Sequence, residues 1–198
     1  MDIIREATEC ARKIFEGDSG GHDFDHTLRV YRMALRLADA EGADSEIVAL
    51  AALLHDVDDR KLSPETCENL GNARKFLHSH GVTAEVAERI LRIISQVSFS
   101  GGKVPDTLDG KCVQDADRLD AMGAIGIART FAYGGSKGRR IYDPAGEDET
   151  TSVQHFYDKL LRLEGLMNTE IGRKLAKDRH VYMEEFLRRF YAEWQGES

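Results

Sequence analysis

Along most of this chain, apolar residues recur three and four positions apart, which is the spacing of one face of an α-helix. No convincing stretch alternates between apolar and polar residues with the period of two that marks a β-strand. The pattern therefore predicts an all-α protein of about seven to nine helices. The predicted helices cover residues 1–17, a stretch from Asp23 or Asp25 to Gly42, and residues 44–56, 63–81, 83–94, 108–133 (in two pieces), 153–167 and 171–194.

One long loop is expected between these helices, over residues 134–146. It combines five glycines or prolines with a basic cluster, Lys137, Arg139 and Arg140. Long loops in compact domains often serve as lids or binding loops. The sequence thus predicts a long basic loop that can contact a ligand.

Length and composition narrow the classes of protein. A chain of 198 residues is most simply one domain, here expected to span residues 1–198. Three cysteines without Cys-x-x-Cys spacing indicate a reducing compartment. The N-terminus lacks a signal-peptide pattern and no apolar run approaches membrane-spanning length, so we expect a cytoplasmic protein. A net charge of -8 argues against duplex nucleic acid or an anionic membrane as the main partner.

The most unusual stretch is an apolar run, residues 47–54, that ends in His55 and three acids, Asp56, Asp58 and Asp59. The C-terminal end of a helix already carries partial negative charge, and neighbouring carboxylates repel one another. Three acids at this place are therefore unfavourable unless a cation neutralises them. The local electrostatics point to a metal ion.

Two other polar residues share the inner faces of predicted helices. His26 lies on a stripe with Val30 at the start of the second helix, and Asp117 shares a face with Val113. Taken singly, each histidine is more often a core residue than a ligand. Together with His55 and Asp56, these residues would supply a mixed nitrogen and oxygen site, which suits Mn, Fe, Ni, Co or Zn.

This ordered set resembles the signature of the HD-domain metal-dependent phosphohydrolases. The order is a histidine, a His-Asp pair and a distal aspartate, here His26, His55-Asp56 and Asp117. The resemblance covers about residues 20–168, the motif-bearing part of the chain. The phrases that look like the small single-domain bacterial members are His22-Asp-Phe-Asp-His-Thr27, His55-Asp-Val-Asp-Asp59, Asp115-Ala-Asp-Arg-Leu-Asp120 and His155-Phe-Tyr-Asp-Lys159.

The resemblance implies a hydrolase that acts on a nucleotide or another small phosphate ester. It implies one divalent metal ion (Mn, Ni, Co, Fe, Zn or Mg) held by His26, His55, Asp56 and Asp117. Positions left open on the ion would take water and a phosphate oxygen. Asp59 stands where a related nucleotidase subgroup has an acid that positions the attacking water. We expect this role for Asp59, with Asp58 as the alternative.

A phosphate group that approaches an acidic site also needs cations. The loop cations can instead balance the neighbouring acids at residues 147–149. The candidate substrate-binding side chains are Arg60, Lys61, Lys137, Arg139, Arg140, His155 and Lys159.

Other functions remain open on sequence alone. The main alternative is a sensor that keeps the fold, binds metal or nucleotide and has little catalytic activity. A plainer alternative is a helical scaffold in which the histidines only pack. Tyr191 and Trp194 near the end of the chain are expected to cover an edge of the core or to contact a second copy in a homodimer.

Overall fold

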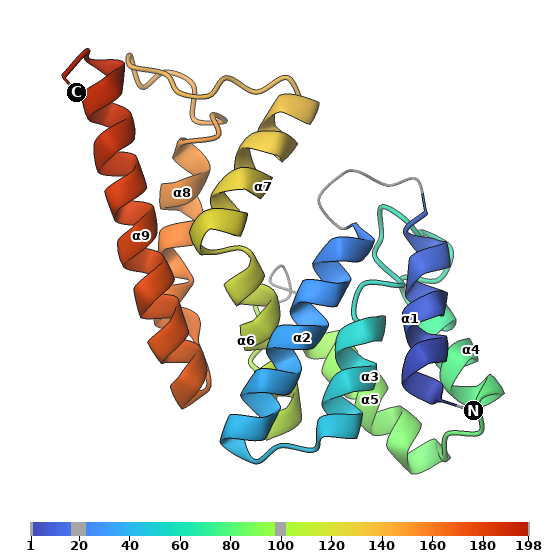
Figure 1. The fold of residues 1–198 in the computed structure, drawn as a ribbon. Coiled ribbons are helices and arrows are strands. Elements are labelled where there is room, and N and C mark those ends of the chain that lie inside the picture. Colours follow the sequence, from blue (N-terminus) through green and yellow to red (C-terminus); the bar gives the residue numbers. More distant parts are fainter. Residues whose placement is uncertain (1, 17–22, 98–101, 198) are drawn as a thin grey trace. The chain divides into compact units, whose positions relative to one another are not determined.

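The computed structural model describes residues 2–16, 23–97 and 102–197, so Gly17 and His22 lie outside the described ranges. Within these ranges the protein has nine α-helices, two short 3₁₀ helices and no β-strand, which confirms the all-α prediction (Figure 1). None of the described helices is both long and apolar enough to cross a membrane. The elements are α1 (Ile3–Ile14), α2 (Phe24–Glu41), α3 (Ser45–Leu54), α4 (Gly71–Ser79), α5 (Ala84–Val97), α6 (Leu108–Asp120), α7 (Gly123–Ser136), α8 (Gln154–Asp158), η2 (Leu160–Arg162), η3 (Glu164–Leu166) and α9 (Glu170–Trp194).

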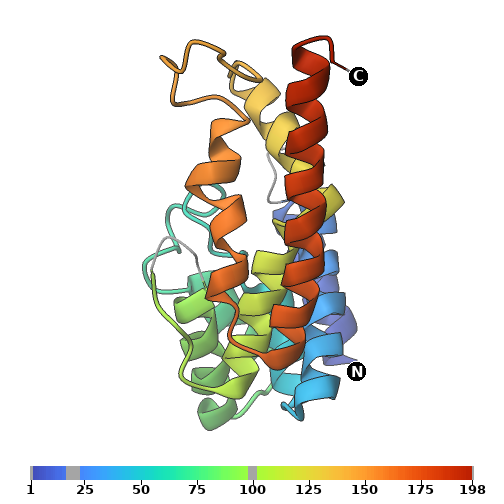
Figure 2. The ribbon, with the colours of Figure 1, turned by 90° about the vertical axis from the view of Figure 1, so that its left-hand side faces the viewer.

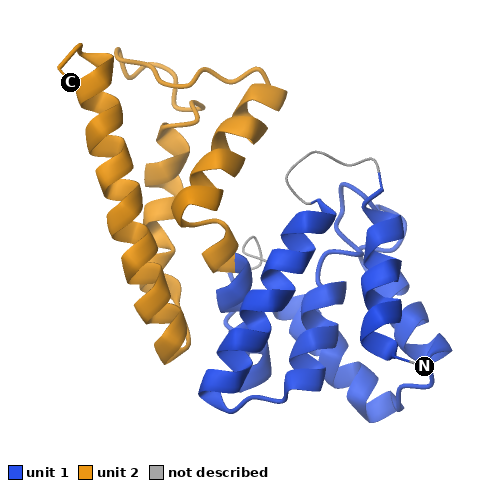
Figure 3. Cartoon of the chain, viewed as in Figure 1, with its two compact units in different colours: residues 1–117 blue, residues 118–198 orange. Residues whose placement is uncertain are grey.

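The chain divides within α6 into two compact units, residues 1–117 and residues 118–198 (Figure 3). The expectation that residues 1–198 form one domain stays a prediction. The four predicted metal ligands all belong to the first unit, whereas the long loop and its cations belong to the second.

The first unit is built around α3. All eight residues from Ile47 to Leu54 are buried, and α3 packs against α1, α2 and α5 (Figure 1). A helix that is apolar on all sides is stable only when other helices surround it. Asp44 begins the helix by accepting the backbone N–H groups of Glu46 and Ile47. The buried helix delivers His55 and the acids that follow it to the interior of the unit.

The fourth helix begins at Gly71, and the predicted start at Ser63 is wrong. Ser63 does not cap a helix, because its hydroxyl donates to the Val57 carbonyl and accepts from the Asn72 side chain. Residues 64–70 form turns that end at Leu70, which has a left-handed backbone with φ of 55°. This conformation is rare for a residue with a side chain and separates the turns from α4.

The second unit contains α7, α8 and the long helix α9, with α7 and η3 packed against α9 (Figure 2). The predicted helix over residues 153–167 is wrong in its continuity: it is α8 followed by η2 and η3. The apolar residues Phe156, Leu160 and Leu163 nevertheless stay buried. Spacings of three and four residues suit short 3₁₀ turns as well as an α-helix, so this pattern alone does not distinguish the two.

The long loop begins after Ser136, where α7 ends, and runs to α8. Its two ends are joined by backbone hydrogen bonds, from Ser152 to Arg140 and from Val153 to Ile141. The Asp143 carboxylate accepts the backbone N–H groups of Ala145, Glu147 and Asp148 and pairs with Arg140 at 3.0 Å. These contacts give the loop a defined internal structure.

Aromatic residues join the loop to the C-terminal end of α9. The Tyr142 ring lies edge-on to the rings of Phe190, Tyr191 and Trp194, at centroid distances of 5.2 to 5.8 Å. Tyr191 and Trp194 therefore pack within the second unit, which is one of the two expected roles. Trp194 remains 46% exposed, and the homodimer stays a prediction.

Candidate metal centre

His26 is placed by the first turn of α2. Asp23 caps this helix, and its carboxylate accepts the backbone N–H of His26 at 2.7 Å. The cap sets the direction in which α2 starts and so directs the His26 side chain inward, where it is 1% exposed. Its Nε2 atom lies 3.5 Å from a carboxylate oxygen of Asp56 and 3.5 Å from one of Asp117.

His55 follows the last residue of α3. Its Nδ1 atom lies 2.8 Å from the Ala52 carbonyl, which can only accept, so in the neutral ring Nδ1 carries the proton and Nε2 presents a lone pair. Nε2 is buried, and an oxygen of Asp56 lies 3.2 Å from it. A backbone carbonyl that fixes the ring in this way is the usual support of a metal-binding histidine.

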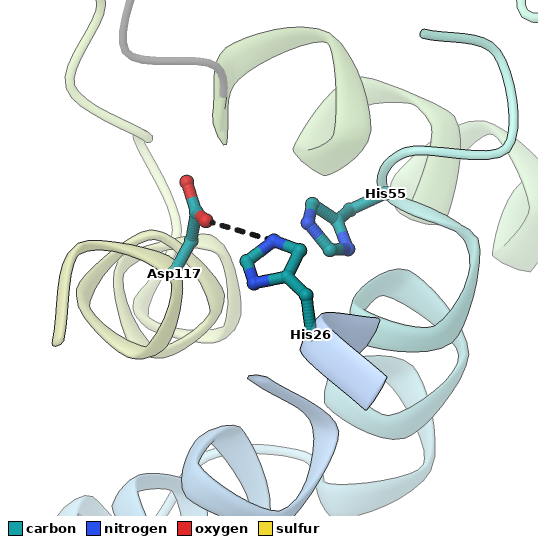
Figure 4. A group of neighbouring side chains, drawn as sticks. All are labelled: His26, His55 and Asp117. Atoms are coloured by element: carbon teal, nitrogen blue, oxygen red, sulfur yellow. Dashed lines mark ion pairs between the residues drawn. The ribbon is translucent and has the colours of Figure 1, made fainter. Parts of the chain in front are cut away.

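Asp117 comes from α6 and completes the group. Figure 4 shows the His26 ring between Asp117 and His55, with the ring planes of the two histidines 65° apart. One donor atom each of His26, His55 and Asp117 lies within 4.8 Å of the others. The same Asp56 oxygen approaches both histidine Nε2 atoms. The structure thus brings together all four residues that the sequence singles out as metal ligands.

The spacing and chemistry of this group fit a divalent metal ion. Metal–ligand bonds of about 2.1 Å place neighbouring ligand atoms about 3.0–3.4 Å apart. Of the observed distances, 3.2 Å lies within this range and 3.5 Å lies just above it. Two imidazoles and two carboxylates form a mixed donor set that suits first-row transition metals.

The electrostatics of the group also favour a cation. Burial alone would lower the pKa of His55, but the negative charge of Asp56 and then that of Asp117 outweigh it and raise this pKa to about 9. A site that holds a proton this strongly attracts a metal ion for the same reason. The histidine side chains are 1% and 3% exposed, whereas those of Asp56 and Asp117 are 18% and 26% exposed. Water therefore reaches the group from its carboxylate side.

The two candidate catalytic acids have different surroundings. Both oxygens of Asp58 are occupied, because they accept the backbone N–H groups of Asn72 at 2.9 Å and Ala73 at 3.0 Å. Asp59 is only half-buried, and one of its oxygens accepts the Lys61 backbone N–H at 2.9 Å. Asp59 is thus less enclosed than Asp58 and is the better candidate of the two.

Sequence reasoning missed Asn72, which joins the turn after α3 to α4. Its backbone N–H binds Asp58, and its side-chain amide donates to the Val57 carbonyl and to two hydroxyls, those of Ser63 and Thr66. Nothing in the local pattern marks this residue, because its partners lie 6 to 15 positions away in the chain. It holds the segment that carries the acids.

The predicted substrate-binding cations of the second unit have different surroundings. Burial and then the charges of Lys159 and Arg139 lower the pKa of His155. Arg139 and Lys137 both lie over the Tyr133 ring, 5.4 and 5.6 Å from its centroid. Arg140 is directed instead to Asp143.

In the first unit, Arg60 forms an exposed ion pair with Glu68 at 3.0 Å. Lys61 contributes its backbone N–H to Asp59. For both residues, a contact with substrate stays a prediction.

Comparison with known proteins places this geometry in a family. The model of the HD domain matches residues 23–122, the segment that holds all four clustered side chains. The Bacillus subtilis protein YpgQ is 41% identical over 203 positions, covering 99% of this chain and 97% of that protein.

Solved structures give the same result over the whole chain. The crystal structure of Bacillus subtilis YpgQ in complex with ADP has a TM-score of 0.81 at 38% identity, covering 97% of this chain and 100% of that one. A Bacillus thuringiensis protein described as an HD-superfamily hydrolase has a TM-score of 0.79 at 42% identity, covering 97% of this chain and 96% of that one. The resemblance found in the sequence is confirmed, and the chain belongs to the HD-domain family.

Proposed function

We propose that the protein is a metal-dependent phosphohydrolase that uses water to cleave a nucleotide or another small phosphate ester. The observation that carries this proposal is the convergence of two imidazole nitrogens and two carboxylate oxygens at 3.2 to 3.5 Å, accessible from one side. A related protein solved as an HD-superfamily hydrolase supports the class of reaction. The related YpgQ structure in complex with ADP supports a nucleotide as substrate.

His26, His55, Asp56 and Asp117 would hold one divalent ion (Mn, Ni, Co, Fe, Zn or Mg), which would supply Lewis acidity for an attacking water and for a phosphate oxygen. The chain itself prepares the ligands. Ala52 fixes the tautomer of His55, so that Nε2 faces the carboxylates. Asp23 fixes the first turn of α2 and with it the position of His26.

Asp59 is the proposed proton acceptor. The turn after α3 places it three residues beyond Asp56, with one oxygen held by the Lys61 backbone. The other oxygen would orient the attacking water and take its proton. Asp58 would act on the site only through structure, by holding the start of α4.

His155, Lys159 and Arg139 are the proposed contacts for phosphate oxygens. A phosphate group bound by them would find two permanent positive charges and one imidazole. The lowered pKa of His155 keeps its ring mostly neutral near neutral pH, so the ring can donate one hydrogen bond without needing a counter-ion. Arg60, Lys61, Lys137 and Arg140 stay secondary candidates.

The test combines metal content with turnover. The purified protein would be analysed for bound metal and then screened for phosphate release from nucleotides and simple phosphate esters, with Mn, Co, Ni or Mg added. Asp56→Ala and Asp117→Ala should lose stoichiometric metal and activity together. Asp39→Ala, an exposed acid on the same helix as His26, is the matched control and should change neither.

Asp59→Ala separates chemistry from metal binding. It should keep the metal and lose rate, because its carboxylate is placed outside the four ligands. Full activity of Asp59→Ala would refute the assignment of the base. Stoichiometric metal with no turnover on any phosphate compound would refute the enzyme and favour the sensor. Absence of metal binding in the wild type, unchanged in the Asp56 and Asp117 variants, would refute both.

A further inference from the structure

The surface between α4 and α5 is hollowed into a cavity of about 610 Å³ that the proposed function does not use. The two helices follow each other in the chain and pack together within the first unit (Figure 1). None of the lining residues belongs to the metal centre. The cavity is lined by Gly71, Arg74, Lys75, His78 and Ser79 of α4, by Val82, and by Ala84, Ala87, Glu88 and Leu91 of α5.

Small residues line the α5 side of the cavity. On α5, Ala84, Ala87 and Leu91 recur at helical spacing, so they form one stripe along the crease. Two of the three are alanines. Leu91 is 3% exposed and closes the floor. The result is an apolar floor that larger side chains would have filled.

The rim of the cavity is basic, although the whole chain is acidic. Arg74 and Lys75 contribute two positive charges against the single negative charge of Glu88, while the net charge of the chain is -8. His78 lies on the same side of α4. Arg74 pairs with Glu88 across the crease at 2.6 Å, and the two side chains are 54% and 64% exposed. An exposed ion pair of this kind contributes little and can be exchanged for another acid.

We propose that this crease binds a small molecule that has an apolar body and one acidic group, such as a carboxylate or a sulfonate. The body would lie on Val82, Ala87 and Leu91, and the acid would take the place of Glu88 on Arg74, with Lys75 beside it. The volume lies within the range of about 300–1,000 Å³ that is usual for small-molecule sites. An apolar floor with a few converging polar groups is also the usual composition of such sites.

The proposal is tested with two fluorescent probes of nearly the same body. 8-Anilino-1-naphthalenesulfonate carries an acid, and N-phenyl-1-naphthylamine lacks it. The sulfonate probe should bind the wild type saturably at one site. Arg74→Ala with Lys75→Ala should weaken it about tenfold, equivalent to about 1.4 kcal/mol, and should change the binding of the neutral probe much less. Glu88→Gln should tighten the sulfonate probe, because it removes the competing carboxylate.

Matched controls come from a second ion pair that involves α5. Arg92 of α5 also forms an exposed ion pair, with Asp106, but lies outside the cavity. Arg92→Ala and Asp106→Asn should therefore leave both probes unchanged. Ala87→Trp should abolish the binding of both probes by filling the crease, while far-UV circular dichroism shows that its helix content is retained.

Three results would overturn the inference. The first is the absence of saturable binding of the sulfonate probe to the wild type. The second is binding that survives Ala87→Trp. The third is an equal loss of both probes in the Arg74 and Lys75 variant, because the acid would then have no contact with the rim.

Discussion

Replacing Asp58 by alanine should destabilise the protein without removing the metal site. The start of α4 has no cap of its own, since Leu70 offers no side-chain hydrogen bond. Asp58 supplies that cap from a distance by binding the backbone N–H groups of Asn72 and Ala73. Its negative charge also lies at the positive end of the helix.

The magnitude follows from these contacts. A hydrogen bond to a charged group contributes about 1.5–3 kcal/mol, and loss of a helix cap costs about 0.5–2 kcal/mol. The two bonds share one carboxylate that is 6% exposed, so we expect Asp58→Ala to lower the free energy of unfolding by about 2–4 kcal/mol in total. For a chain of this size that corresponds to a fall in Tm of about 4–16 °C. Asp58→Asn keeps one acceptor oxygen and should lose about half as much.

The assay measures stability and function on the same samples. Thermal unfolding followed by circular dichroism gives the Tm, and metal analysis below the transition gives the stoichiometry. Asp58→Ala should bind one equivalent of metal at low temperature, because none of the four clustered side chains is changed. An unchanged Tm together with a large loss of rate at full metal occupancy would refute the structural role and assign Asp58 to the chemistry.

Three further predictions test other parts of the structure. Gly126→Ala should destabilise the protein by about 1–3 kcal/mol, because the new Cβ would lie 2.2 Å from the Ala121 carbonyl oxygen. In the same helix, a Cβ at Gly135 would meet no atom within 4 Å, so Gly135→Ala should stabilise the protein by about 0.5–1 kcal/mol. Denaturant unfolding measures both changes. The pKa of Asp143 is lowered by the backbone N–H of Asp148 first and then by those of Glu147 and Ala145. The Asp143 carboxylate therefore stabilises the protein fully at a pH above its pKa in the unfolded chain, and this stabilisation is lost as the pH falls through its pKa in the folded protein. The difference in Tm between wild type and Asp143→Asn should shrink on acidification. Lys159→Ala should raise KM for a nucleotide more than it changes kcat, whereas an unchanged KM would contradict a phosphate contact.

The sequence predicted best those features that depend on local periodicity and on an ordered set of residues. The run from Ile47 to Leu54 is apolar at every position, which predicts a fully buried element, and the helix that forms there directs His55 inward. Asp117 could be assigned to the same site as His55 only through the resemblance of the ordered residues to a family signature. Distances in the chain of 29 and 62 residues separate His55 from His26 and from Asp117, and no local pattern spans them.

Features that depend on distant partners escaped prediction. Ser63-Pro64-Glu65 has the composition of a helix start. The Ser63 hydroxyl is instead hydrogen-bonded to the Val57 carbonyl and the Asn72 side chain, and the helix begins at Gly71. The break between α8 and η2 falls at Lys159, which has a φ of -134°. No residue type in the segment requires this backbone conformation. The cavity between α4 and α5 arises from side chains that are small, and small residues leave no periodic signal.

The three acids after α3 are stabilised in different ways. All three were expected to need a cation, because they follow the negative end of a buried helix. Asp58 is instead stabilised by two N–H groups at the positive end of α4, and Asp59 by the N–H of Lys61. Only Asp56 is directed at the two histidines. The positive end of α4 thus stabilises the charge of Asp58. The carboxylates of Asp56 and Asp117 are the ones that need a cation, and there a metal ion has nitrogen ligands as well.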